Sequence, residues 1–560
     1  MSANVAAAEH PKLSWRFPPT FWFANVAELC ERAAFYGMFI TLFRYLTDYI
    51  GFTDEQTGLI TGAFASILYF LPTFMGIMAD KIGFKTALLI AFALLTGGYG
   101  LLGAYQLKLT ALIALTLIMF GGAIIKPVIS GTVAKCSDSA HRARAMSIFY
   151  MVVNIGAFSG KALAGELNEL LGLQHINFYA AGMSAVALVV VALFYRNVDT
   201  AGTGKTVREA LAGLARVIVN FRFMALILIV AGFWAIQGQL YSSMPTYIER
   251  LLGKGYKPEW LANINPLVVV LLVVPITHLI RNFQPANAIG LGLLIIPCTA
   301  LVVALGPRLE AITGSSIDLG IVSLHPIVAV FIVGIALQGV AECFLSPKWL
   351  EYVSKQAPEG EVGLYLGYSH LTTFFAWLFG FVLAGYLLAG FCPDPRTLEP
   401  DVRAQWRAAT DPYYRATLPG TLADELPDDG PLPGDVRVAL TQVGVTLPAD
   451  AVVKRENPDD KIGNARDQRS WTIALGDRTL TLTELAFKPK NSSGATVREL
   501  VVSSSVALPR DQRPPLPDAY AKAHYIWFVF TGVGVVAFLA LLLFKYVVGR
   551  IDRARAAAAG

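Results

Sequence analysis

Charged side chains are scarce in this 560-residue sequence: they make up 15% of it, against about 25% in soluble domains. There are only five cysteines, with no CxxC pair and no Cys/His spacing, which excludes a disulfide framework or zinc site of familiar type. No GxxxxGK(S/T) loop occurs, so nothing indicates a pump driven by nucleotide hydrolysis. No nucleophile–base–orienter set is visible, and a net charge of +5 is too small to indicate a nucleic-acid partner. We therefore expect neither an enzyme nor a cofactor.

Long apolar runs are what the sequence has instead. Its mean hydropathy is +0.54, and runs of about 20 apolar residues recur, as expected of an all-α protein that crosses the bilayer many times. We predict twelve spans, at about 20–46, 58–79, 84–105, 109–133, 145–168, 176–195, 223–248, 262–281, 286–305, 326–350, 363–391 and 525–548.

The basic residues of the connecting loops predict the orientation. They follow spans 2, 4, 6 and 12, on one side of the membrane, so both termini are expected in the cytoplasm. The first 17 residues lack a signal-peptide pattern and are interpreted as a cytoplasmic tail. Between spans 6 and 7 the apolar spacing predicts an interfacial helix that joins two six-helix halves. The expected organisation is an N-terminal half (1–196), a linker (197–222), five helices (223–391), an insert (392–523), the last span (524–548) and a tail (549–560).

The insert differs sharply in composition from the rest of the chain. It is rich in Pro, Asp, Arg and Thr and has no run long enough to span. The alternation at 478–483 and the apolar run at 500–502 predict strands, with turns at 476–477 and 491–494. The crowded Pro and Asp signals of the first part favour loop. Span parity places the insert outside the cytoplasm, as a small β-containing domain.

Span 1 contains the most unusual charges. Glu28, Glu31 and Arg32 lie on one helical face with Phe35 and Phe39, and Glu28 and Arg32 form a favourable i, i+4 pair. Charge inside the hydrocarbon costs a few kcal/mol or more. This face must therefore point into the bundle or a wet cavity rather than toward lipid.

The turn after span 2 carries the first resemblance to a known family. Gly76, Asp80 and Gly83 lie in GIMADKIGFK, which resembles the loop motif between the second and third helices of the major facilitator superfamily. The glycines suit close helix contact and a tight turn, and Asp80 suits a cap on span 3 or a pair with neighbouring basic groups. The resemblance implies the twelve-helix fold of that superfamily, in two six-helix halves.

Four further stretches resemble the proton-dependent oligopeptide transporter family, also called PTR2. The span 1 motif ELCERAAFYG resembles its ExxERFxYYG signature, and FYMVVNIG in span 5 resembles FYxxxNxG. GGAIIKP in span 4 and GVAECFLSP in span 10 resemble its GxxKP and GE…SP segments. The resemblance covers all twelve spans and excludes the insert and the tails. It implies that Glu28, Glu31 and Arg32 couple transport to protons.

Lys126 in span 4 and Glu342 in span 10 are the candidate substrate contacts. Each lies about 16 residues from the outer end of its span, roughly 24 Å along the helix, and the two spans correspond in the two halves. A cation and an anion at similar depth complement a zwitterion such as a short peptide. The alternative is a static Lys126–Glu342 bridge, although desolvating two charges is a costly route to stability.

Three uncharged residues complete the predicted binding site, each with a structural alternative. Asn154 could bind a peptide backbone or make an interhelical hydrogen bond. Tyr36 and Tyr69 could line side-chain pockets or simply pack. Lys161, toward the outer end of span 5, is expected to snorkel to the interface.

Two departures from the family pattern occur together. Phe39 replaces the arginine that commonly follows the YYG motif, and Gly238 replaces the usual acid in span 7. In the family these residues act as a partner pair on the extracellular side, and losing both strands neither charge. The pattern indicates a divergent member with an altered outer gate.

The sequence thus favours a proton-coupled symporter of di- and tripeptides or similar small zwitterions, working by alternating access as a monomer in the lipid bilayer. The proton serves as coupling ion, and a bacterial inner membrane is the expected location. A first alternative keeps the machinery but carries another small metabolite. A second is a non-transporting receptor that senses through the insert.

Overall fold

The computed structural model describes residues 17–138, 141–198, 206–253, 255–320, 322–357, 362–456, 469–487 and 496–559. The chain forms two compact units, each described by itself. Unit 1 comprises 1–38, 67–163 and 177–220, and unit 2 comprises 39–66, 164–176 and 221–560. Helices α1, α2, α6 and α7 contribute residues to both units.

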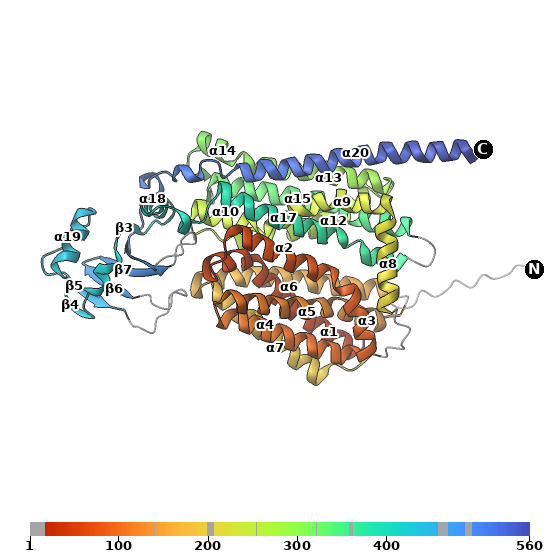
Figure 1. Ribbon diagram of the computed structural model, residues 1–560, viewed down its shortest axis with the longest axis horizontal. Coiled ribbons are helices and arrows are strands. Elements are labelled where there is room, and N and C mark those ends of the chain that lie inside the picture. The colour runs from red at the N-terminus through yellow and green to blue at the C-terminus, as the bar shows by residue number, and fades with distance from the viewer. Residues whose placement is uncertain are drawn as a thin grey trace, which may run out of the picture. The chain divides into compact units, whose positions relative to one another are not determined.

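Unit 1 is built from helices of the first half of the chain (Figure 1). They are α1 (Pro19–Arg44), α3 (Pro72–Ile82), α4 (Phe84–Ala104), α5 (Lys108–Lys135), α6 (Arg142–Leu171), α7 (Leu173–Phe194) and α8 (Val207–Val219).

Unit 2 contains the remaining helices, a short hairpin and the insert. Its elements are η1 (Tyr45–Tyr49), α2 (Asp54–Phe70), α9 (Phe221–Gln237), η2 (Gly238–Leu240), α10 (Ser243–Leu252), α11 (Pro258–Leu261), α12 (Ile264–Leu279), α13 (Pro285–Ala304), α14 (Gly306–Thr313), β1 (Ile317–Asp318), β2 (Ser323–Leu324), α15 (Pro326–Gln356), α16 (Val362–Tyr368), α17 (Leu371–Phe391) and, after the insert, α20 (Tyr525–Ala559).

The helices account for the predicted spans. Within the described residues, ten helices are long and apolar enough to cross a membrane, and the bent pair α2 and α3 would make an eleventh. The twelfth predicted span is α1, which is 26 residues long and contains the charges at Glu28, Glu31 and Arg32. The predicted all-helical membrane fold is thereby confirmed.

Predicted spans 2 and 7 are interrupted, and span 11 is interrupted between α16 and α17. Span 2 bends by 49° between α2 and α3, where Pro72 begins the second helix, because proline cannot donate to the preceding turn. Span 7 passes through the 3₁₀ turn η2 between α9 and α10. The side chain of Gln239 compensates there: its Nε2 donates to the carbonyl of Ala235 at 2.8 Å, and its Oε1 accepts from Ser242 and Ser243.

Small residues bring α1 and α6 into close contact in unit 1. A Cβ at Gly160 would lie 2.8 Å from Ala33 Cα, and one at Gly156 would lie 2.7 Å from Arg32 Cβ. Both distances are shorter than real Cβ contacts, so the two backbones approach as closely as glycine permits. The stem of Arg32 is consequently held against α6.

This crossing predicts a stability effect. Gly160→Ala should lower the free energy of unfolding by about 1–3 kcal/mol, because the added methyl forces the helices apart. Gly182→Ala on α7 is the matched control, since its Cβ would meet nothing within 4 Å and alanine favours helix. Thermal unfolding of both purified variants in detergent measures the difference, and equal stability would contradict the packing described.

The predicted linker helix is confirmed as α8. Thr206 caps it in a capping box with Glu209, which satisfies two backbone amides reciprocally. Of the predicted apolar stripe, Val217 is buried, whereas Leu211 and Ile218 are exposed. The exposed apolar positions are those that an interfacial helix would place against lipid.

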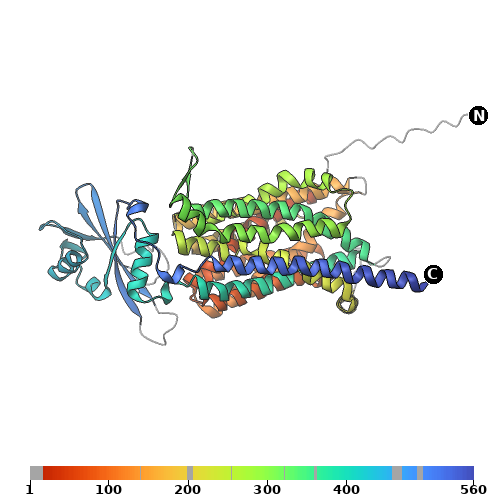
Figure 2. The same ribbon diagram turned by 90° about the horizontal axis from the view of Figure 1, so that it is seen from above.

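In the part that the structure describes, the insert forms a six-stranded antiparallel sheet with two α-helices (Figure 2). The strand order is β3-β8-β7-β6-β5-β4. Its elements are η3 (Pro395–Thr397), α18 (Pro400–Thr410), β3 (Tyr414–Pro419), η4 (Gly420–Asp424), β4 (Asp429–Pro431), α19 (Gly434–Gln442), β5 (Val452–Arg455), β6 (Ser470–Leu475), β7 (Arg478–Phe487), β8 (Val497–Ser504), η5 (Arg510–Gln512) and η6 (Asp518–Tyr520).

The β-containing insert was predicted correctly, but its first part is not mainly loop. The predicted strands are β7 and β8, where Leu482 pairs with Val502 in the buried core, and Gly476 turns the β6–β7 hairpin at φ +64°. The predicted turn at 491–494 lies outside the described residues. The first part instead contains α18 and α19, which begin at Pro400 and just after Pro433.

Candidate functional site

The charged face of α1 is buried in unit 1, as its position inside an apolar helix requires. Glu28, Glu31 and Arg32 are 3%, 1% and 5% exposed. Arg32 Nε lies 3.2 Å from Glu28 Oε1, which confirms the predicted i, i+4 pair, and its guanidinium also contacts the carboxylate of Glu31. Among the described residues Glu28 Oε2 has no hydrogen-bond partner. One cation is therefore shared by two buried acids.

Aromatic rings surround the cations of this cluster. The guanidinium of Arg32 lies 6.0 Å from the ring centroid of Tyr36, and Lys126 Nζ lies 3.5 Å from that of Tyr69. Lys126 also interacts electrostatically with Arg32, Glu31 and Glu28. Lys126 was predicted to serve the substrate and α1 to serve the proton, yet in unit 1 their charges form one cluster.

Lys161 extends the cluster and corrects one prediction. Its side chain is 2% exposed, and Nζ lies 6.0 Å from the ring centroid of Tyr36. It therefore does not snorkel to an interface as expected, because α6 crosses α1 too closely at Gly160 for this side to face lipid. The neighbouring glycine was the sequence signal that could have placed it inside.

The predicted loop motif supports the helix that carries Lys126. A Cβ at Gly76 on α3 would lie 3.3 Å from Cβ of Pro127 on α5, so the glycine permits α3 to pack beside the Lys-Pro turn. Gly83 links α3 and α4 at φ +86°, a conformation that favours glycine. Asp80 lies on the last turn of α3, but Gly83 is the N-cap of α4, so Asp80 does not cap that helix.

Two further predicted binding residues have side-chain hydrogen bonds of their own. Asn154 donates from Nδ2 to the carbonyl of Tyr150 on its own helix, at 2.8 Å. Glu342 lies on α15 in unit 2, where Asn265 Nδ2 is 3.4 Å from its Oε2. Gly339 permits this approach, since a Cβ there would lie 2.8 Å from Val268.

The positions of the missing charge pair are packed against the same aromatic side chains in unit 2. Phe39 stacks on Trp377, with ring centroids 5.4 Å apart, and lies 6.1 Å from Phe381. A Cβ at Gly238 would lie 3.1 Å from both Trp377 Nε1 and Phe381 Cε1. A larger side chain at 238 would therefore require these rings to shift, so both departures from the family pattern lie against the same two aromatic side chains.

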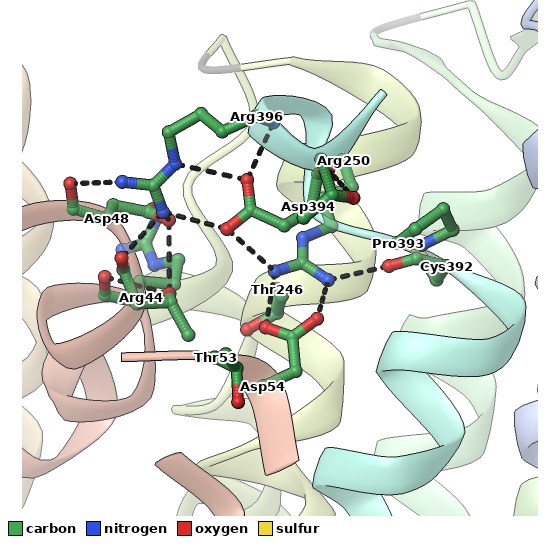
Figure 3. A network of polar contacts seen from close by, with 12 residues as sticks. Arg44, Asp48, Thr53, Asp54, Thr246, Arg250, Cys392, Pro393, Asp394 and Arg396 are labelled. Atoms are coloured by element: carbon green, nitrogen blue, oxygen red, sulfur yellow. Dashed lines mark hydrogen bonds and ion pairs between the residues drawn. The ribbon is translucent and has the colours of Figure 1, made fainter. Parts of the chain in front are cut away.

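A second network of charges joins helix ends of unit 2 to the insert (Figure 3), and we call it the outer network because the insert is predicted to lie outside the cytoplasm. Arg250 on α10 donates to both carboxylate oxygens of Asp54 at 2.7 and 2.8 Å and to the carbonyl of Cys392 at 2.6 Å. Arg44, at the end of α1, pairs with Glu249 and Glu259. Arg44, Asp54 and Arg250 are each less than 5% exposed. Removing one partner of such a buried pair strongly destabilises the folded protein.

The insert takes part in this network through its first residues. Arg396 donates to the carbonyls of Thr47 and Asp48 at 2.6 Å and pairs with Asp48 and Asp394 (Figure 3). Burial alone would lower the pKa of Arg396, but the charges of Asp394 and Asp48 outweigh it and raise the pKa. Arg396 therefore stays charged and ties the insert to the end of α1.

Sequence reasoning missed this outer network because its members come from three distant segments, 44–54, 249–259 and 392–396. Each residue alone resembles an ordinary loop or helix-end charge. The available signal was that Arg44 and Arg250 lie at the ends of otherwise apolar runs, where a charge needs a partner.

The protein is a helical membrane protein with buried, paired charges in its apolar helices. Such charges are typical of membrane transporters. A sequence model of the Major Facilitator Superfamily matches residues 29–324, more than half of the chain. The protein belongs to the Major Facilitator Superfamily, whose members are transporters and not enzymes.

Two proteins of known name and one solved structure are similar to this chain. The chain is 24% identical to a dipeptide and tripeptide permease A of Citrobacter koseri over 69% of this chain and 88% of that protein. It is 23% identical to a multidrug resistance protein MdtH of Salmonella arizonae, over 65% and 85%. A crystal structure of a POT family transporter in complex with 5-aminolevulinic acid superposes with a TM-score of 0.56 at 19% identity, over 66% and 91%. That likeness shows the shared fold.

Proposed function

We propose that this protein is a proton-coupled symporter of di- and tripeptides or similar small zwitterions, acting by alternating access. The buried cluster of Glu28, Glu31, Arg32 and Lys126 is the observation that carries the proposal. Two acids that share one arginine can take up a proton when that arginine moves away, so protonation can follow the state of the transporter. The permease among the relatives supports peptides as cargo.

In this proposal Glu31 and Glu28 carry the proton and Arg32 is their alternating partner. Lys126 binds the substrate carboxylate and Glu342 its ammonium, so each terminal charge of a peptide meets an opposite charge. Tyr36, Tyr69 and Asn154 line the substrate pocket. Lys126 also responds to the proton, because its charge interacts with those of Glu28 and Glu31.

The protein works as a monomer in the bilayer, with the proton as its coupling ion. Both termini face the cytoplasm, as the distribution of basic loops predicts, and the inner membrane of a bacterium is the proposed location. The proposed organisation is two six-helix halves joined through α8.

A second candidate function is transport of another small metabolite by the same machinery. The MdtH relatives favour it. The loss of the charge pair at Phe39 and Gly238, which both pack against aromatic side chains, favours it as well. The receptor alternative has no observation in its favour, because buried ionisable groups in the spans are better suited to transport than to sensing.

Substrate class is tested by uptake into proteoliposomes with an imposed inward proton gradient and negative interior. We expect labelled dipeptides to accumulate, and N-acetylated or amidated dipeptides to accumulate at least ten-fold less. Uptake of lipophilic drug cations without uptake of any peptide would contradict the proposal and favour the second candidate. Empty liposomes under the same gradients provide the control.

A further inference from the structure

A large cavity lies in unit 2 where α10 and α11 meet the insert. Its volume is about 920 Å³, within the range of cavities that bind small molecules. One wall carries Thr246, Glu249 and Arg250 of α10. A second wall belongs to α18 of the insert, which contributes Arg403, Trp406 and Arg407. The insert thus supplies part of the cavity.

Beside the α10 wall, two acids contact one arginine. Arg44, at the end of α1, pairs with Glu249 on α10 and with Glu259 on α11. Glu259 is 1% exposed, and its Oε2 has no hydrogen-bond partner among the described residues. The Glu249 side chain is 19% exposed, so it is the member of this trio that a ligand in the cavity meets first.

On the α18 wall, two arginines contact one acid. Arg403 and Arg407 share one carboxylate, that of Glu499, at 3.1 and 2.7 Å. Arg403 is 5% exposed, and its Nε has no partner among the described residues. Two arginines on successive turns of one helix therefore line the cavity and share one acid.

The two walls together form a bipolar site. A buried polar atom without a partner costs free energy that a ligand can recover, and here an acid and an arginine are each left incompletely satisfied. We propose that the cavity is a second binding site for short peptides or similar zwitterions, with the ammonium at Glu249 and Glu259 and the carboxylate at Arg403 and Arg407. In its choice of ligand this inference rests on the proposed function.

The proposed site gives the insert a task in transport. The insert captures substrate at the outer side and holds it next to the charged network formed by Arg44 and Arg250. Trp406 links the two walls, because its indole Nε1 donates to the carbonyl of Arg250 at 2.7 Å. A ligand that contacts Arg407 and Glu249 would therefore bridge the insert and α10.

The test measures binding of labelled trialanine to the purified full-length protein in nanodiscs. Lys126→Gln/Glu342→Gln first silences the proposed transport site. We expect this variant to retain one binding event for trialanine. Adding Arg407→Gln or Glu249→Gln should weaken that event at least ten-fold, because each change removes one charged contact. Arg478→Gln, at an exposed arginine of the β6–β7 hairpin, is the matched control and should change nothing.

A comparison of peptides on one protein variant avoids the risk that a further substitution weakens binding by misfolding the protein. In the same Lys126→Gln/Glu342→Gln background, N-acetyltrialanine and trialanine amide each lack one terminal charge, and each should bind at least ten-fold more weakly than trialanine. Equal affinity for all three peptides, or equal effects of Arg407→Gln and Arg478→Gln, would overturn the inference.

The two proposals fail in distinguishable ways. If the native protein accumulates peptides while the Lys126→Gln/Glu342→Gln variant binds none, the cavity site is wrong and the proposed function stands. If trialanine binds to the variant with the expected charge dependence but the native protein transports no peptide, the site stands and the transport proposal is wrong.

Discussion

Glu31→Gln is expected to abolish proton-driven accumulation of dipeptide while leaving substrate exchange across the membrane. Glutamine keeps the size and hydrogen bonding of the side chain but cannot take up a proton. Arg32 keeps Glu28 as a partner at 3.2 Å, so the α1 cluster should remain folded. In proteoliposomes, accumulation under a proton gradient should fall by more than ten-fold, whereas counterflow of unlabelled against labelled dipeptide should stay within two- to three-fold of the native rate.

The control for this prediction is Glu425→Gln, which changes an exposed glutamate of the insert and should leave both assays unchanged. Accumulation that survives intact in the Glu31→Gln protein would show that Glu31 is not the coupling acid. Loss of counterflow together with accumulation would instead indicate a structural role, and thermal unfolding of the variant would then decide.

Arg250→Ala should be the most destabilising single substitution in the outer network. It would remove the bidentate partner of Asp54, the hydrogen bond to Cys392 and the nearby charge for Asp394, 4.0 Å away. Because Asp54 and Asp394 are 4% and 3% exposed, both acids would remain buried without this cation. Breaking a buried pair in this way costs about 3–5 kcal/mol. Thermal or denaturant unfolding of the purified protein measures the loss.

An exposed ion pair supplies the comparison. Arg455 and Asp428 in the insert are 2.8 Å apart, with side chains that are 30% and 79% exposed, so Arg455→Ala should cost no more than about 1 kcal/mol. Combining Arg250→Met with Asp54→Leu should recover part of the stability lost in Arg250→Ala. The double change removes the carboxylate at position 54 together with its partner, so no unpaired charge stays buried there. Equal stability of Arg250→Ala and Arg455→Ala would mean that the outer network does not hold unit 2 together.

Local patterns were sufficient to predict most of the membrane helices and part of the charged cluster. Apolar runs of spanning length predicted the helices, and the i, i+4 spacing predicted the contact between Glu28 and Arg32. The interruption at Pro72 was also visible as a residue type but was read as part of one continuous span. A proline in an apolar run marks a possible bend, and only packing decides how far the helix turns.

In the first part of the insert, proline is compatible both with a loop and with the start of a helix. Its prolines were interpreted as loop signals, yet Pro400 occupies the first turn of α18 and Pro433 is the N-cap of α19. Proline is favoured at the first helical position, where the missing amide donor costs nothing. Composition alone does not separate a helix start from a turn.

Contacts between distant segments could not be predicted from the sequence. Asp54, Arg250 and Asp394 meet in one network although each is separated from the others by more than one hundred residues. The packing of Phe39 and Gly238 against Trp377 is of the same kind. Their joint departure from the family pattern was visible, but the aromatic side chain that relates them was not.

The most direct test of the account is whether a dipeptide itself drives proton movement. Proteoliposomes with a pH-sensitive dye inside are given a negative interior potential and no pH gradient, and dialanine is then added outside. Coupled symport predicts that the lumen acidifies on addition of dialanine in the native protein and not in Glu31→Gln. Uptake of labelled dialanine without any acidification in the native protein would contradict proton coupling.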